Sequence, residues 1–300
     1  MKILVTGGAG FIGSHLVEEL LSNENEILIF DNCLTGKKEN LDIKGNFKFI
    51  NDDFGSENSL EEIERFNPDI CFHLAAQSSV VVSVENPALD FEHNILQPIK
   101  LIQVLLKSNC KKFVFTSSGG TIFGEPTTIP TAEEDYADEP ESPYGVAKKR
   151  LNELIKIMTK SSNLKYSILN LSNVYGPRQD PYGEAGVVSI FAKKYLNNEE
   201  PIVYGDGEQT RDYIYVKDVV SALIKASLIE ENHFLNIGTS VETSVNDLVN
   251  SMKIQFNSQI NPIYKPAREG ELKRSVLNNT KAKEDLDWKP EYSLDRGMKE

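Results

Sequence analysis

The sequence predicts an α/β fold in which helices cover both faces of a parallel sheet. Short runs rich in β-branched and aromatic residues recur from Ile3 to Ser118, and segments with helical periodicity separate them. The first run ends in closely spaced glycines, which is typical of a parallel strand that turns directly into a helix. Because strands and helices alternate without an internal repeat or a low-complexity linker, we expect a doubly wound parallel sheet.

The first strand and helix enclose the pattern of a dinucleotide site. The apolar run from Ile3 to Val5 precedes the spacing Gly8-x-Gly10-x-x-Gly13, and helical periodicity follows. In a Rossmann-type sheet such glycines supply a sharp turn, close approach for a pyrophosphate and close helix packing, while the helix N-terminus attracts the anion. We therefore expect the cofactor to contact Gly7, Gly10, Phe11, Ile12 and Gly13.

The second strand, from Glu26 to Phe30, ends at Asp31 and the adjoining Asn32. Asp31 lies eighteen residues beyond Gly13, close to the ~20 residues at which an acid accepts hydrogen bonds from an adenosine ribose. An acid there repels a 2′-phosphate and so indicates NAD. Lys37 and Lys38 leave NADP open as the alternative.

The next two strands supply the remaining cofactor contacts. A strand from Phe47 to Ile50 leads to Asp53 and Phe54, which we place at the adenine edge, before a charged helix from about Glu57 to Phe66. The segment from Asp69 to Gln77 is a fourth strand that ends in small residues, as a cofactor pressed against a sheet requires. Its contact residues are Leu74, Ala75 and Ala76, whereas His73 lies within the strand pattern and is expected in the core.

A long apolar helix is predicted from Pro87 to Lys107. Its apolar residues exceed one narrow stripe, so it can pack on the sheet and on a second copy of the chain. This pattern hints at a homodimer.

The fifth strand, from Lys112 to Ser118, ends in hydroxyl groups, and a second long helix begins near Pro143. Tyr144 and Lys148 are four residues apart and lie on one face of that helix. A nearby ammonium favours the ionised form of a phenol, whose ordinary pKa is about 10. We therefore expect Lys148 to lower the pKa of Tyr144 and make it a base.

Composition excludes several classes of protein. The 300 residues, 40% of them hydrophobic, suffice for one large α/β domain or for a domain with a smaller lobe. The formal net charge of -13 disfavours nucleic acid and membrane surfaces as partners. Three dispersed cysteines and four histidines show no ligand spacing, so no metal is expected. No apolar run approaches the ~18 residues of a membrane span, and we expect a cytoplasmic protein.

Taken together, six motifs in order resemble the extended short-chain dehydrogenases/reductases, and within them the nucleotide-sugar epimerases and dehydratases. They are Thr6-Gly-Gly-Ala-Gly-Phe-Ile-Gly13, His73-Leu-Ala-Ala76, Ser117-Ser118, Tyr144-x-x-x-Lys148, Asn173-Val-Tyr-Gly-Pro-Arg-Gln179 and Gly205-Asp-Gly-Glu-Gln-Thr-Arg-Asp212. The resemblance covers nearly the whole chain. It implies an NAD-binding domain over residues 1–173 and 212–238, and a smaller C-terminal lobe for a UDP- or dTDP-sugar over residues 174–211 and 239–300.

The resemblance also implies roles near the reacting sugar. A serine or threonine after the fifth strand hydrogen-bonds the sugar hydroxyl, Tyr144 takes its proton, and Lys148 also holds the nicotinamide ribose. Counting from the strand gives Ser118 the first role, with Ser117 and Thr121 in reserve. Counting back from Phe123-Gly124 gives Gly119, which has no hydroxyl.

For the substrate, the resemblance places Asn173 near the diphosphate and Arg211 and Arg268 on the phosphates, where guanidinium forks suit paired oxygens. Arg178 is a weaker choice. The stretch from Gly183 to Val188 resembles the segment over the nucleotide base, so Val188 is a contact residue. Ser275 corresponds to the position beside the 2-substituent of the sugar, and a small residue there implies that N-acetyl sugars are accepted.

Three functions remain open at this point. The first is 4-epimerisation of a UDP-hexose, in which Tyr144 removes the C4 hydroxyl proton as hydride passes to NAD and then returns to the other face of a 4-keto sugar. The second is a 4,6-dehydratase, which needs an Asp-Glu pair where this chain has Gly119-Gly120-Thr121. The third is a non-catalytic NAD-binding sensor.

Overall fold

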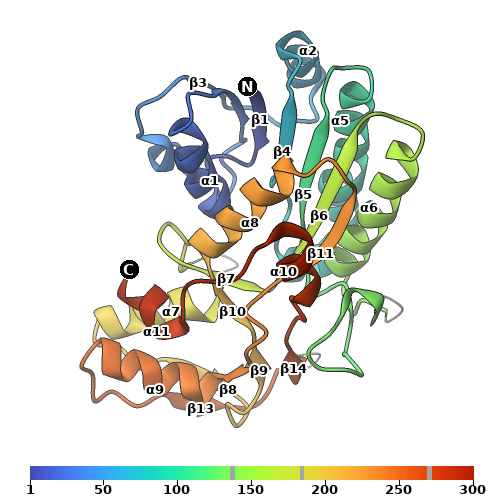
Figure 1. Ribbon diagram of the computed structural model, residues 1–300. Coiled ribbons are helices and arrows are strands. Elements are labelled where there is room, and N and C mark those ends of the chain that lie inside the picture. The colour runs from blue at the N-terminus through green and yellow to red at the C-terminus, as the bar shows by residue number, and fades with distance from the viewer. Residues whose placement is uncertain (136–138, 183–185, 269–271) are drawn as a thin grey trace.

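The computed structural model describes residues 1–135, 139–182, 186–268 and 272–300 (Figure 1). A central sheet of seven strands has the order β11-β6-β5-β4-β1-β2-β3, and neighbouring strands run parallel. The strands are β1 (Lys2–Thr6), β2 (Glu26–Phe30), β3 (Phe47–Ile50), β4 (Ile70–His73), β5 (Lys112–Ser118), β6 (Lys165–Leu171) and β11 (His233–Ile237). The chain moves outward from β1 to β3 and then returns to β4 beside β1, and such a switch point opens a crevice at the carboxyl ends of the strands. The predicted doubly wound sheet is confirmed.

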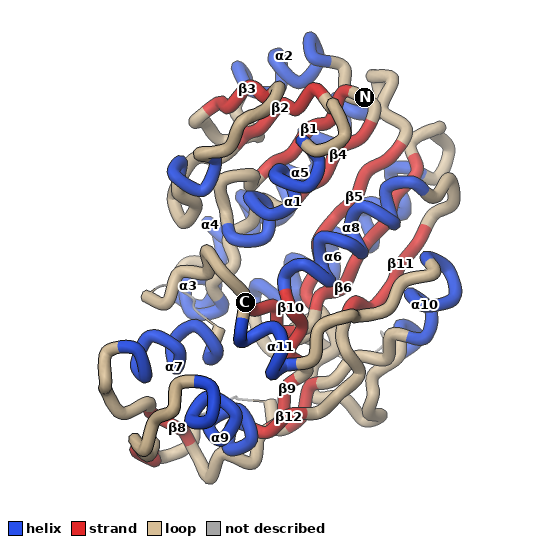
Figure 2. The backbone as a smooth tube through the Cα atoms, turned by 60° about the vertical axis from the view of Figure 1, so that its left-hand side comes forward, coloured by secondary structure: helices blue, strands red, loops and turns tan. Residues whose placement is uncertain are grey.

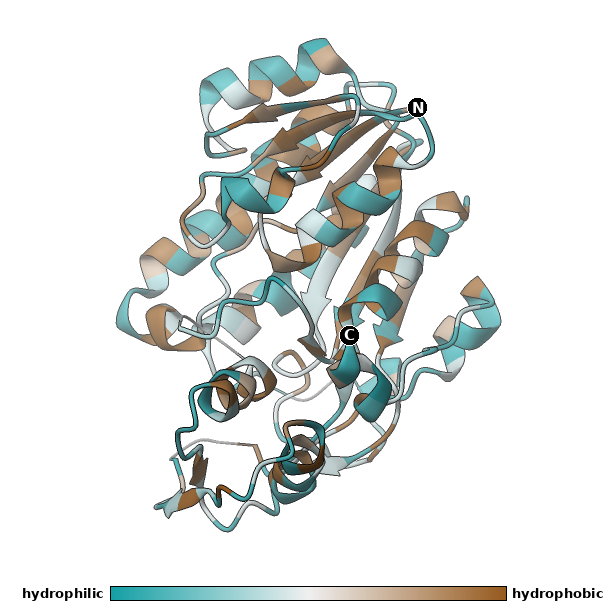
Figure 3. Ribbon diagram, turned by 90° about the vertical axis from the view of Figure 1, so that its left-hand side faces the viewer, coloured by the Kyte–Doolittle hydropathy of each residue, from teal (hydrophilic) through white to brown (hydrophobic). Residues whose placement is uncertain are grey.

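Helices cover both faces of the sheet. One face carries α1 (Phe11–Leu21), α8 (Val216–Leu228) and α10 (Thr280–Leu286), and the other carries α2 (Glu57–Phe66), α5 (Gln97–Leu105) and α6 (Pro143–Thr159). Alternate residues of β1 divide between the two cores, since Ile3 packs in the cluster of α1 and α8 while Leu4 packs in that of α5 and α6. Figure 3 shows brown strands between helices that alternate brown and teal, the pattern of a sheet buried on both sides.

The helix predicted from Pro87 to Lys107 is interrupted. It consists of α4 (Pro87–Phe91), a π-helical turn (Glu92–Leu96) and α5, and the short helix α3 (Val80–Glu85), which was not predicted, precedes it. Pro98 in the first turn of α5 has no N–H, and its ring crowds the carbonyl four residues earlier. The backbone therefore widens into a π turn before α5 begins.

The smaller lobe lies below the sheet in Figures 1 and 2. Its strands form three small sheets, β7 (Asn173–Tyr175) with β10 (Tyr213–Tyr215), β8 (Ile202–Tyr204) with β13 (Ile263–Lys265), and β9 (Thr210–Arg211) between β12 (Thr243–Ser244) and β14 (Arg274–Ser275). Its helices are α7 (Val187–Leu196), α9 (Val245–Gln255) and α11 (Leu294–Lys299), which share a core with β7 and β10. Short 3₁₀ turns occur at Lys38–Leu41 and Glu133–Asp135. The domain boundaries given above stay a prediction.

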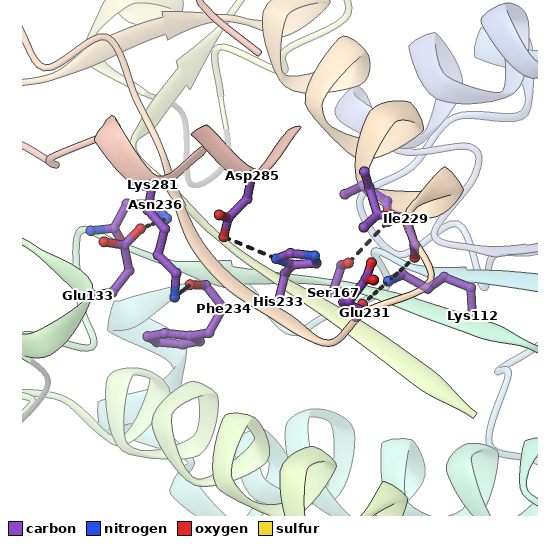
Figure 4. Close-up of polar contacts among 11 residues, drawn as sticks. Lys112, Glu133, Ser167, Ile229, Glu231, His233, Phe234, Asn236, Lys281 and Asp285 are labelled. Atoms are coloured by element: carbon purple, nitrogen blue, oxygen red, sulfur yellow. Dashed lines mark hydrogen bonds and ion pairs between the residues drawn. The ribbon is translucent and has the colours of Figure 1, made fainter. Parts of the chain in front are cut away.

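Polar contacts hold the edge strand β11 in place (Figure 4). The Lys112 ammonium donates to the carbonyls of Ile229 and Glu231, both at 2.7 Å, just beyond the end of α8. On the open side of β11, the backbone N–H of Asn236 donates to the Glu133 carboxylate at 2.7 Å, and His233 Nδ1 lies 3.2 Å from Asp285 Oδ2. These contacts cover an edge that would otherwise present unpaired backbone groups.

In the described ranges of the chain, no helix has both the length and the apolar character needed to cross a membrane.

Candidate active site

The glycine turn at the end of β1 can be built only without side chains. Gly7 has φ +74°, and a Cβ there would lie 2.6 Å from the backbone nitrogen of Ala75. A Cβ on Gly13 would lie 2.0 Å from the carbonyl oxygen of Gly7. Gly10 is the N-cap of α1 and offers no side-chain cap. The first turn of α1, with Phe11 and Ile12, therefore presents backbone amides at the switch point of the sheet, where they suit a pyrophosphate.

Asp31 joins this turn to the end of β2. Its carboxylate accepts hydrogen bonds from the amides of Ala9 and Cys33, each at 2.9 Å. Burial raises the pKa of Asp31, and the backbone donors oppose that shift. The carboxylate thus organises the glycine turn in addition to its predicted contact with a ribose. Asn32 follows it and accepts a hydrogen bond from the amide of Leu34 at 3.0 Å.

The residues predicted at the adenine and nicotinamide ends follow β3 and β4. Asp53 accepts a hydrogen bond from Gln97 at 3.2 Å, and Phe54 is buried with its ring edge-on to His73. Leu74, Ala75 and Ala76 are half-buried where β4 ends. His73 is a core residue as predicted, because its ring is buried, meets Thr6 Oγ1 at 2.7 Å, and has a pKa lowered to about 3 by burial.

Tyr144 and Lys148 lie in the first turns of α6. Ser142 is the N-cap, accepting a hydrogen bond from the amide of Gly145 at 3.1 Å, and Pro143 occupies the first turn. Lys148 is 3% exposed, and its ammonium donates to the carbonyl of Thr116 at 3.1 Å. The same nitrogen lies 4.7 Å from the ring centre of Phe115 and 5.8 Å from that of Tyr144. The helix face predicted from the sequence is therefore present.

The predicted lowering of the pKa of Tyr144 by Lys148 is wrong for this arrangement. Burial raises the pKa of Tyr144 to about 12, the hydrogen bond with Ser118 opposes that shift, and the charge of Asp90 adds to it. Burial also lowers the pKa of Lys148 to about 8, against the opposing effect of Asp90. The physical reason is that desolvation of both groups outweighs the attraction expected from spacing alone.

The three candidates for the hydroxyl beside the sugar, Ser117, Ser118 and Thr121, differ in their hydrogen bonds and in their positions at the cavity. Ser118 shares a hydrogen bond with Tyr144 and lines a cavity of about 310 Å³. Thr121 lines the same cavity, and its buried hydroxyl has no hydrogen-bond partner among the described residues. Ser117 is 4% exposed, and within the described part of the chain its hydroxyl has no hydrogen-bond partner either. The geometry favours Ser118 as the group beside a reacting hydroxyl.

The cavity lies between the carboxyl ends of the central strands and the lobe. It is lined by Val80, Ser118, Gly120, Thr121, Gly124, Glu141, Ser142, Leu171, Ser172, Asn173, Arg211, Leu272 and Ser275. Five residues predicted to contact substrate therefore meet in one place, namely Ser118, Thr121, Asn173, Arg211 and Ser275.

Arg211 and Ser275 are register partners on the parallel strands β9 and β14. Their neighbour Asp212 is fully buried, and its carboxylate accepts from the amide and hydroxyl of Thr239 at 2.8 and 2.6 Å and from the amide of Ser240 at 3.1 Å. The amide of Asp212 also donates to the carbonyl of Ser275 at 3.0 Å. Asp212 thus ties its own strand to the segment of Thr239 and Ser240 through its carboxylate and to Ser275 through its backbone amide.

The structure places other predicted substrate residues outside the lining of this cavity. The exposed Arg268 stacks its guanidinium 3.9 Å from the ring centre of Tyr204. Val188 is buried in the lobe core, and residues 183–185 of its predicted loop lie outside the described residues. Arg178 pairs with Glu18 at 2.7 Å.

Sequence reasoning missed a polar group behind Tyr144 and Lys148. Asp90 on α4 accepts hydrogen bonds from the side-chain amides of Gln77 and Asn94 at 2.7 and 2.9 Å. Its signal in the sequence is the spacing of Asp90 and Asn94, which puts two polar residues on one face of an otherwise apolar helix.

The family model described as GDP-mannose 4,6 dehydratase matches residues 4–300. A UDP-glucose 4-epimerase of Mycolicibacterium smegmatis is 38% identical over 302 residues, which cover 99% of this chain and 96% of the relative. The crystal structure of a UDP-glucose 4-epimerase with UDP-glucose from Thermotoga maritima has a TM-score of 0.96 and 45% identity, covering 100% of this chain and 96% of that one. A Thermus thermophilus UDP-glucose 4-epimerase complex with NAD has a TM-score of 0.92 and 38% identity, covering 100% and 97%. The chain belongs to the GDP-mannose 4,6 dehydratase family of extended short-chain dehydrogenases/reductases.

Proposed function

We propose that this protein interconverts the C4 epimers of a UDP-hexose with NAD as its cofactor. The observation that carries the proposal is the hydrogen bond between Ser118 and Tyr144, together with one cavity that is lined by Ser118, Arg211 and Ser275. The similarity to UDP-glucose 4-epimerases with UDP-glucose and with NAD supports both the substrate and the cofactor.

The residues present fit NAD. The turn at Gly7 and Gly13 leaves no room for a Cβ, so the backbone can approach a pyrophosphate closely. Asp31 supplies a carboxylate for ribose hydroxyls at the end of β2. When bound, NAD supplies a site that accepts a hydride from the sugar and gives it back.

The chain's own groups handle the proton. Ser118 is placed to hold the C4 hydroxyl of the sugar, and Tyr144, hydrogen-bonded to Ser118, takes the hydroxyl proton as a phenolate, after loss of its own proton, and later returns it. Lys148 carries a positive charge 5.8 Å from the ring centre of Tyr144, and this charge counters only in part the rise in the Tyr144 pKa that burial causes. Arg211 suits the diphosphate, so the sugar is held at one end and can turn over at the other.

The dehydratase alternative lacks its acid–base pair. A Cβ added to Gly119 would lie 2.4 Å from Leu277 Cδ1, so a carboxylate side chain has no space there without movement of Leu277. Gly120 carries no side chain either, and Thr121 is a weak acid.

Proton NMR of the protein incubated with UDP-galactose, without added reductant, tests the proposal. We expect UDP-glucose to appear and NAD to be released on denaturation. A 4-keto-6-deoxy sugar would instead identify a dehydratase. An unchanged UDP-galactose in the presence of bound NAD, extending to dTDP- and GDP-hexoses, would support the sensor.

We further propose a homodimer in the cytoplasm. Helices α3, α4, the π turn and α6 pack together and expose Val81, Val84, Leu89, Phe91, Leu96 and Ile157. A two-fold contact between copies would cover these apolar side chains. The three free cysteines, two of them buried, suit a reducing compartment. Light scattering should give twice the chain mass of 33.6 kDa, and a mass equal to one chain would reject the dimer.

A further inference from the structure

Asp90 is a buried charge that the proton steps above leave unused. It is 0% exposed on α4, and one of its two carboxylate oxygens, Oδ1, accepts hydrogen bonds from the side-chain amides of Gln77 and Asn94. The other oxygen, Oδ2, has no hydrogen-bond partner among the residues that the structure describes. A carboxylate in this condition destabilises the fold unless a nearby positive charge compensates for its burial.

The compensating charge lies on the neighbouring helix. Helix α4 packs against α6, and Lys148 on α6 is itself 3% exposed with a carbonyl and an aromatic ring as its nearest described contacts. Neither contact carries a full negative charge. Burial raises the pKa of Asp90 and lowers that of Lys148, and the charge of each group opposes the shift of the other.

The other titratable groups around Asp90 do not replace this partner. His93 on the π turn acts on Asp90 but lies 3.6 Å from the carboxylate of Asp53. Tyr144 is neutral near pH 7, and His73 is neutral because burial lowers its pKa to about 3. From α3, the acid Glu85 is exposed at the helix end. Of the two described cations whose charges act on Asp90, Lys148 is therefore the buried one.

We propose that Asp90, held by Gln77 and Asn94, is a positioning residue that keeps the buried Lys148 in its ammonium form beside Tyr144. The π turn has a part in this arrangement, because it carries Asn94, whose amide bridges Asp90 and the carbonyl of Gln77 at 2.9 and 2.8 Å. The inference rests on the proposed function only in one respect, namely that Lys148 assists Tyr144 in proton transfer.

The test compares Asp90→Asn with Asp218→Asn in the protein as purified with its cofactor. Asp218 is a matched control, because it is also a buried carboxylate, 2% exposed, but it binds the amides of Glu291 and Tyr292 near the C-terminus. NMR of labelled lysine side chains, with the Lys148 signal identified by its loss in Lys148→Met, measures the pKa of Lys148. We expect Asp90→Asn to lower that pKa by about one unit or more, and Asp218→Asn and Asp90→Glu to leave it within a few tenths.

The rate profile gives a second readout. In the wild-type protein, turnover of UDP-galactose should fall as the pH rises through the Lys148 pKa of about 8. In Asp90→Asn this alkaline limb should move to lower pH, whereas a merely structural role would reduce the rate at every pH without moving the limb. An unmoved Lys148 pKa and an unmoved limb in a folded Asp90→Asn protein would overturn the proposal.

If Asp90→Asn does not fold, the interaction between Asp90 and Lys148 can be measured through the pKa of Asp90 instead. Linkage is reciprocal, so removing the ammonium in Lys148→Met should raise the pKa of the Asp90 carboxyl by the same number of units that Asp90 adds to Lys148. An Asp90 pKa equal to that of wild type would overturn the inference. Neither NMR titration requires turnover. An unchanged pKa would therefore contradict this inference alone, whereas a wild-type protein that does not epimerise UDP-galactose would contradict the proposed function.

Discussion

The two walls of the cavity are built in different ways. The catalytic wall stands on β5 and β6, which pair over seven residues in the middle of the sheet and present Ser118 beside α6. The recognition wall stands on β9 and β14, which are two residues long and depend on the buried carboxylate of Asp212. A long parallel pair holds its side chains through many neighbouring hydrogen bonds, whereas short strands rely on a few specific contacts.

This difference suggests a division of tasks. The reacting hydroxyl must stay within reach of Ser118 and Tyr144, so that wall needs rigid support. The wall with Arg211 and Ser275 must hold a diphosphate while the sugar turns, and its sequence can change without disturbing the central sheet. We expect substitutions on the first wall to reduce turnover and substitutions on the second to alter affinity and substrate range.

The largest effect is expected at the catalytic wall. Tyr144→Phe removes the phenol that transfers the proton and should reduce kcat by about 10²- to 10⁴-fold, while NAD stays bound and the fold is kept. Steady-state kinetics and cofactor release on denaturation measure both. Tyr166→Phe is the control, because Tyr166 lies near the opposite, amino end of β6. A near-normal rate in Tyr144→Phe would remove it as the base.

A comparison of two glycine substitutions tests the role of the glycine turn in NAD binding. Gly13→Ala should lose NAD, because the new Cβ would stand 2.0 Å from the Gly7 carbonyl oxygen and force the turn apart. Gly120→Ala should keep NAD, since the nearest atom to its Cβ is Ser275 Oγ at 4.0 Å. Cofactor content after gel filtration distinguishes the two variants. Retention of NAD by a folded Gly13→Ala protein would contradict the role of this turn.

A smaller effect is expected where one carboxylate supports the recognition wall. Asp212→Asn replaces an acceptor oxygen by a donor facing the Thr239 and Ser240 amides, which should destabilise the protein by about 1–3 kcal/mol. Arg211 and Ser275 should then be less well placed, so KM should rise more than kcat falls. Thermal unfolding and kinetics measure these changes. A fall in kcat with KM unchanged would show that this wall contributes to the chemical step.

The smallest effect should be selective. Ser275 is 8% exposed and lines the cavity, and its hydroxyl lies 4.0 Å from the place of a Cβ added to Gly120. We expect UDP-N-acetylglucosamine and UDP-N-acetylgalactosamine to be substrates, and Ser275→Tyr to suppress their turnover while UDP-galactose is still converted. Competition between the two substrate pairs in one reaction measures the preference. Wild-type turnover confined to the non-acetylated pair, with no change in Ser275→Tyr, would refute the idea.

The contrast between the catalytic wall and the recognition wall also explains which features could be predicted from the sequence. The strands Glu26–Phe30, Phe47–Ile50 and Lys112–Ser118 have the predicted bounds, because local apolar runs encode them. The face shared by Tyr144 and Lys148 likewise follows from helix geometry. The raised pKa of Tyr144 was not predictable, because it depends on burial and on Asp90, which is distant in the sequence.

The recognition wall was predicted only by resemblance. The pairing of Arg211 with Ser275 joins strands that are 64 positions apart, and no local pattern in two-residue strands announces it. The interruption before Pro98 was visible in the sequence, since a proline inside a helical pattern marks a kink, but the apolar run concealed it.

The central claim is that Tyr144 and Ser118 support an oxidation and reduction at C4 within one closed site. Conversion of UDP-galactose in D₂O, with the product examined by NMR, tests it most directly. Because the hydrogen that leaves C4 returns to the same carbon, we predict UDP-glucose without deuterium at C4. Deuterium at C4 would show exchange with solvent by a different route and would contradict the account.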